Sequence, residues 1–99
     1  MSREISLSVN DVPINLDYFV RGYIDQVVGG IIASLKDTGA IESLELTIDN
    51  DGQVAINLNN SAVPLIYFPN EIIRNTVTGM VAPLKGVDEV NRLQINITK

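Results

Sequence analysis

The chain aligns with itself at an offset of 49 residues, and this internal repeat constrains the fold more than any other feature. Residues 5–49 match residues 54–98 without a gap. Unrelated segments would agree at about one position in sixteen, and these segments agree far more often. The identical pairs are Asn10/Asn59, Leu16/Leu65, Tyr18/Tyr67, Phe19/Phe68, Ile24/Ile73, Val28/Val77, Gly30/Gly79, Ala33/Ala82, Leu35/Leu84, Lys36/Lys85, Leu44/Leu93 and Ile48/Ile97. Such a period is typical of a repeated supersecondary unit, so we expect one domain over residues 1–99, built from repeats 5–49 and 54–98.

Each repeat has the pattern of a strand, a helix and a second strand. Apolar and polar residues alternate over 5–10 and 43–49, and again in the second repeat, as in half-buried strands. Between them, apolar residues recur at spacings of three and four, which predicts a helix with one apolar face. Asp49-Asn50-Asp51-Gly52 separates two strand patterns and predicts a tight hairpin.

The order of elements is therefore β-α-β-β-α-β. Short connections and right-handed crossovers favour an α+β, ferredoxin-like two-layer sandwich with two helices on one face of the sheet. In this arrangement the last strand, 93–98, lies at a sheet edge. The stretches 10–17 and 59–66 are long for simple connections, and an extra short hairpin arm in each is the alternative. Pro13 and Pro64 would confine such arms to the edges of the sheet.

A further pattern runs from the first strand into the first helix: Val9-Asn10, Ile14, Leu16 and Phe19-Val20. Followed by an apolar helix that contains glycine, it resembles small prokaryotic proteins, archaeal ones in particular, with a duplicated βαβ unit. No activity is assigned to that group. The resemblance therefore implies a fold and no functional residue.

Composition excludes several functions. The chain has no Cys and no His, which removes thiolate nucleophiles, zinc–thiolate sites and the commonest general base near neutral pH. The formal net charge is −5 and the basic residues are scattered singly, so we expect no nucleic-acid partner. The apolar runs are too short for a membrane span. We expect a cytoplasmic protein with no membrane contact, no cofactor and no metal site.

Catalysis would depend on carboxylates. The candidates for general acid–base chemistry are Asp11, Asp17, Asp25, Glu42, Glu71 and Asp88. No spacing singles out a pair, so no catalytic residue is predicted, and a carboxylate-based enzyme is our third hypothesis. The acidic turn at 49–52 is not a calcium loop, because the first and twelfth ligand positions of the template would be Thr47 and Leu58.

Aromatic pairs open both helices, Tyr18-Phe19 and Tyr67-Phe68. The phenylalanines are expected to anchor the helix entrances in the core. The tyrosine hydroxyls would then reach water or the backbone. In the alternative interpretation, Tyr18 and Tyr67 line a cleft for a flat ligand. A small-ligand-binding domain is therefore the alternative function.

The helices also carry candidate contact surfaces. Gly30 and Gly79 lie on equivalent flanks and are expected to let the two helices approach closely. The apolar arcs are wide enough that Ile32 and Val81 are expected towards the outside, where they would form an interface.

Gly22 and Gly29 have no glycine counterpart in the second repeat, where Glu71 and Thr78 stand. One explanation is sequence drift that a stable helix tolerates. The other is that these glycines form a strip without side chains, which lets another backbone lie close to the first helix. The leading hypothesis is thus a non-catalytic, self-associating interaction or scaffold module that forms a homodimer. A different protein partner remains open as an alternative.

Overall fold

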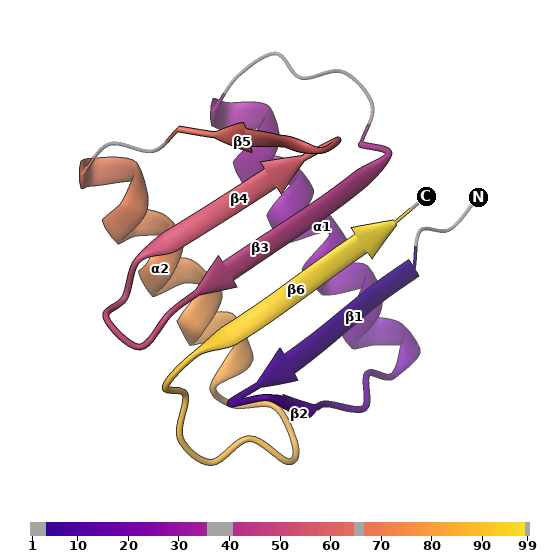
Figure 1. Cartoon of the computed structure of the whole chain (residues 1–99). Helices are drawn as coiled ribbons and strands as arrows, with labels where there is room; N and C mark the ends of the chain where they lie inside the picture. Colours follow the sequence, from indigo (N-terminus) through magenta and orange to yellow (C-terminus); the bar gives the residue numbers. More distant parts are fainter. Residues whose placement is uncertain (1–3, 36–40, 65–66, 99) are drawn as a thin grey trace.

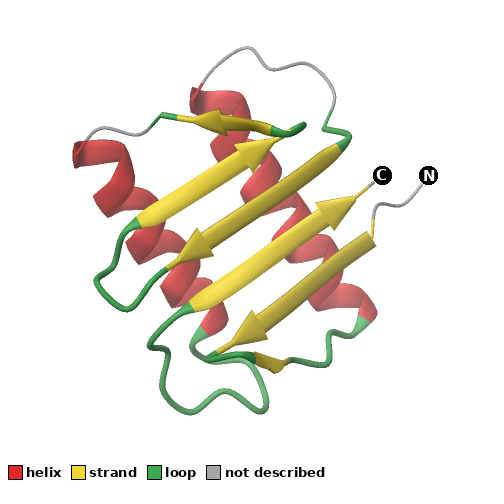
Figure 2. Ribbon diagram, viewed as in Figure 1, coloured by secondary structure: helices red, strands yellow, loops and turns green. Residues whose placement is uncertain are grey.

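The computed structural model describes residues 4–35, 41–64 and 67–98, in which two helices cover one face of a six-stranded sheet (Figure 1). Figure 2 shows the same two layers and leaves the other face of the sheet uncovered. The elements are β1 (Glu4–Val9), β2 (Val12–Pro13), α1 (Tyr18–Leu35), β3 (Ser43–Ile48), β4 (Val54–Leu58), β5 (Ser61–Val63), α2 (Tyr67–Val81) and β6 (Leu93–Thr98). The expected α+β class is confirmed.

The strand order is β2-β1-β6-β3-β4-β5, and every neighbouring pair is antiparallel. In a ferredoxin-like sandwich the first strand of each β-α-β unit lies at the centre of the sheet. Here the second strands, β3 and β6, lie at the centre, so the order differs from the one we expected. The prediction that 93–98 lies at an edge is wrong, because β6 pairs along its whole length with both β1 and β3.

The alternative with extra hairpin arms is confirmed, since β2 and β5 form the two edges of the sheet. Each arm begins with a two-residue turn in which both residues have positive φ, 52° and 69° in Asn10-Asp11 and 51° and 70° in Asn59-Asn60. Type I′ hairpin turns require this geometry. Asn and Asp are the residues other than glycine that tolerate it best.

Each turn asparagine also holds the start of a central strand that belongs to the other repeat. The Oδ1 atom of Asn10 accepts hydrogen bonds from the N–H groups of residues 91 and 92, at 2.9 and 3.0 Å. The Oδ1 atom of Asn59 accepts from those of residues 42 and 43, at 2.8 and 3.0 Å. The two repeats are therefore interleaved, with β6 placed between β1 and β3.

The hairpin predicted at 49–52 joins β3 to β4, which pair antiparallel. The Oδ1 atom of Asp49 accepts from the N–H groups of Asp51 and Gln53, at 2.9 and 3.0 Å. Gly52 has a φ of 80°, which glycine adopts without the steric cost of a Cβ. The sequence therefore predicted this turn correctly.

The core lies between the sheet and the helices. Leu46 of β3 and Ile95 of β6 face it from the centre of the sheet and are fully buried. Ile24 and Ile73 face it from the two helices and are also fully buried. No helix of the described residues is long and apolar enough to cross a membrane.

Two expectations about the helices are wrong. Ile32 and Val81 are 1% and 0% exposed, because each extends a buried i, i+4 series that lies against the sheet. Gly30 and Gly79 do not mediate close helix packing, since a Cβ on either would meet no atom within 4 Å. Both glycines are exposed, so they lie on the solvent side of their helices and not between them.

Candidate interaction site

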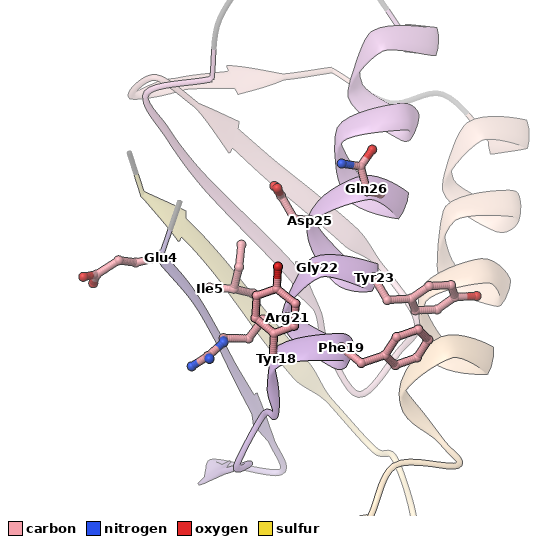
Figure 3. Close-up of a pocket in the computed structure, with 9 residues that line it drawn as sticks. All are labelled: Glu4, Ile5, Tyr18, Phe19, Arg21, Gly22, Tyr23, Asp25 and Gln26. Atoms are coloured by element: carbon pink, nitrogen blue, oxygen red, sulfur yellow. The ribbon is translucent and has the colours of Figure 1, made fainter. Parts of the chain in front are cut away.

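Exposed aromatic side chains gather at the start of α1. The side chains of Tyr18, Phe19 and Tyr23 are 87%, 73% and 50% exposed. The rings of Phe19 and Tyr23 stack with centroids 5.9 Å apart and planes inclined by 14°. Figure 3 shows these two rings on one flank of α1 and Tyr18 on the other. We refer to these three residues as the aromatic cluster.

The expectation that Phe19 anchors the core is wrong. The buried face of α1 follows Ile24 and Val28, with Val20 half-buried on the same side. Phe19 precedes Val20 by one residue and is therefore rotated by about 100° around the helix. The side chain of Phe68 lies outside the described residues, so the same expectation for Phe68 stays a prediction.

A shallow hollow of about 810 Å³ lies between β1 and the first turns of α1. A Cβ on Gly22 would meet no atom within 4 Å, so none of the described residues fills the space above it. Figure 3 shows the hollow, which is lined by Glu4, Ile5, Tyr18, Phe19, Arg21, Gly22, Tyr23, Asp25 and Gln26. The structure thus places Tyr18 and Gly22, two of the predicted site residues, in one depression.

The other predicted site residues do not join them. Ile32 and Val81 are buried in the core. Gly29 is half-buried further along α1. The side chain of Tyr67 lies outside the described residues, so the predicted pairing of Tyr18 with Tyr67 in one cleft stays a prediction.

The sequence analysis missed two charged residues of the hollow, Glu4 and Arg21. Both are exposed, and among the described residues no ion pair involves either of them. One carries a negative charge and the other a positive charge. The sequence signal that was available for Arg21 is that its counterpart in the second repeat is Asn70, a residue of very different chemistry.

The candidate catalytic carboxylates mostly have structural partners. Asp11 pairs with Arg92, and Glu71 pairs with Arg74 one turn along α2. The Oδ1 atom of Asp17 accepts from the N–H of Val20 at 2.8 Å and caps the start of α1. No group of three His, Cys, Asp or Glu side chains in the described parts of the chain could hold a metal ion.

The ion pair between Asp11 and Arg92 gives a testable pH dependence of the stability. The hydrogen bond and charge of Arg92 hold the pKa of Asp11 below its ordinary value. The pair therefore adds stability above the unfolded pKa of about 4, and this stability is lost as the pH falls through the folded pKa. Asp11→Asn should lower the free energy of unfolding at pH 7, and lower it less at pH 2. The effect should be small because both side chains are exposed.

Urea denaturation at the two pH values measures this difference. Asn60 occupies the equivalent turn position of the second repeat, so asparagine suits the backbone there. An equal loss at both pH values would show that the substitution acts through the turn and not through the ion pair.

The described residues thus combine an exposed aromatic cluster, an open hollow and carboxylates that serve as caps and ion-pair partners. No family model, curated protein or solved structure matches the chain.

Proposed function

We propose that this chain is a non-catalytic, self-associating interaction module that assembles as a two-fold homodimer. The observation that carries the proposal is the aromatic cluster, three large rings exposed within six residues of one helix. Fully burying one such side chain gains about 1.5–3 kcal/mol. The stacked rings of Phe19 and Tyr23 form a contiguous exposed patch on one flank of α1. Patches of this kind commonly mark protein–protein contacts, and closed two-fold dimers are the commonest assembly.

We also propose that the domain arose by internal duplication. The two asparagine turns share their φ values to within 1°, and each makes the same pair of hydrogen bonds to the opposite central strand. A chain that contains two equivalent units is consistent with an ancestor that associated as two separate copies. The absence of Cys suits a cytoplasmic setting.

A small-ligand-binding domain is the second candidate function, favoured by the hollow beside Tyr18. An aromatic or other flat molecule would stack on the exposed ring there. Such binding would not change the mass of the protein in solution. The mass therefore separates the two candidates.

The test is sedimentation velocity or light scattering at micromolar concentration. We expect a mass of twice the 10.8 kDa of one chain. Changing Tyr18, Phe19 and Tyr23 together to Gln should weaken association at least tenfold, since Gln keeps helix propensity and removes apolar surface. Ile72→Gln is the matched control, because Ile72 is 51% exposed and lies outside the cluster. A monomer mass at every concentration tested would refute the proposal.

A further inference from the structure

The two halves of the sheet differ in how their outer strand is closed. On β4, the N–H of Val54 donates to Oδ1 of Asn70 at 2.8 Å, and Nδ2 of Asn70 donates to the carbonyl of Gly52 at 3.2 Å. Asn70 is 9% exposed. Its carboxamide supplies one acceptor and one donor and so takes the place of a neighbouring strand beyond the end of β5.

The matching position on β1 is open. Ile5 is the counterpart of Val54, and β2 pairs only with Ser8 and Val9. The carbonyl of Leu7 accepts from Ile14 on the β2 side, at 2.9 Å. Alternate residues of an antiparallel strand direct their N–H and C=O groups to the same side, so those of Ile5 also face outward. Among the described residues no hydrogen bond reaches Ile5 from that side.

The counterpart of Asn70 is Arg21, and it cannot close this edge. A guanidinium group has donors and no acceptor, so it offers nothing to the N–H of Ile5. Arg21 is exposed and lines the hollow together with Ile5 and Tyr18 (Figure 3). An open strand edge of this kind is a template for a strand from another chain.

We propose that the β1 edges of two copies of this chain pair antiparallel about a two-fold axis, with Ile5 opposite the same residue of the second copy. The two sheets then form one continuous sheet. This inference rests on the proposed self-association and places one member of the aromatic cluster, Tyr18, at the contact, whereas Phe19 and Tyr23 lie on the other flank of α1 (Figure 3). Ile5 supplies both its N–H and its C=O to the pairing.

Charge favours a second copy as the occupant. Glu4 and Arg21 lie on this surface with opposite charges and without ion-pair partners among the described residues. In a two-fold arrangement each surface faces its own copy, so each Arg21 can pair with Glu4 of the second copy. The dimer then contains two equivalent ion pairs. Complementary potentials of this kind select the correct partner.

The same arrangement accounts for the glycines of α1. When β1 edges pair, the outward flanks of the two α1 helices become neighbours above the sheet. Gly22 lies on this flank with open space above it, and Gly29 follows two turns later. Glycine allows close backbone approach, which offsets the lower helix propensity of glycine relative to alanine.

The experiment introduces into the first repeat the asparagine that closes the β4 edge in the second repeat. Arg21→Asn should let residue 21 close the β1 edge as Asn70 closes β4, and should weaken association at least tenfold in sedimentation velocity. Arg21→Lys is the control, because lysine keeps the charge and also lacks an acceptor. It should associate within threefold of the parent protein. The charge pair is tested by Arg21→Glu and Glu4→Arg, each of which should weaken association, whereas the double variant should restore it.

Amide hydrogen exchange provides a second readout that follows the backbone. We expect the Ile5 amide to be protected only at concentrations where the dimer forms, and the Val54 amide to be protected at all concentrations. In Arg21→Asn the Ile5 amide should become protected in the monomer as well. This pattern also shows that the variant is folded.

The outcomes separate the two proposals. If the parent protein is a monomer throughout, the proposed self-association is wrong and this inference is wrong with it. If the parent protein is a dimer, and Arg21→Asn dimerises equally well while the Ile5 amide exchanges rapidly in the dimer, the β1 edge is not the contact. Self-association would then stand on another surface, and this inference alone would be overturned.

Discussion

Replacing both turn asparagines, Asn10 and Asn59, by alanine is expected to destabilise the fold severely. At each position alanine would adopt a positive φ, at a cost of about 1–2 kcal/mol. It would also remove the acceptor for two backbone N–H groups, for about 1 kcal/mol each. The two turns hold different central strands, so the losses should add to roughly 6–8 kcal/mol. That sum approaches the whole stability of a typical domain.

Glycine and aspartate at the same two positions separate the causes. Glycine accepts a positive φ and loses the hydrogen bonds, so it should be less harmful than alanine. Aspartate keeps an acceptor and tolerates the turn, so it should be the mildest change. Urea denaturation followed by circular dichroism ranks the three. If alanine and glycine variants were equally stable, the positive φ would contribute nothing.

The second large effect is expected at the centre of the core. Leu46 on β3 lies opposite Ile56 on β4 and Ile95 on β6, and it is fully buried. Leu46→Ala should lower the free energy of unfolding by about 2–5 kcal/mol, through lost apolar contact and the cavity left behind. The same change at Ile95 should have a similar effect, because both residues occupy central strands.

Thr47→Ala is the matched control for the core substitution. Thr47 is the next residue on β3 and faces the open side of the sheet, where it lies opposite Gln94 and Ala55. It should change stability by less than about 0.5 kcal/mol. A Leu46→Ala variant as stable as Thr47→Ala would mean that the two faces of the sheet have been assigned the wrong way round.

The sequence predicted the elements and faces well, but not the order of the strands. Periodicity shows which residues of a strand are buried, as it does for Leu44, Leu46 and Ile48. A ferredoxin-like order would bury the same residues against the same two helices. Which strands become neighbours depends on how the Asn10 and Asn59 turns direct the chain, and the strand pattern alone does not contain that information.

The candidate site was only partly predictable for a similar reason. A helical wheel gives the angles between side chains but not the direction of the sheet, so Ile32 was placed outside and Phe19 inside. Tyr18 and Gly22 were assigned to two different sites, a ligand cleft and a docking strip, and the structure brings them to one hollow. The open edge at Ile5 required the hydrogen bonds of Asn70, which only the structure provides.

The central position of β6 also has a consequence for how fast the chain folds. Its ladder with β1 joins residues from opposite ends of the described chain, from Glu4 with Thr98 to Val9 with Leu93. Non-local pairing of this kind places a chain towards the slow end of two-state folding, in the range of milliseconds to seconds. Until β6 inserts, β3 has one unpaired edge beside an exposed apolar face. The unfolded protein should therefore lose more material to aggregation when it refolds at high protein concentration than when it refolds after dilution to low concentration.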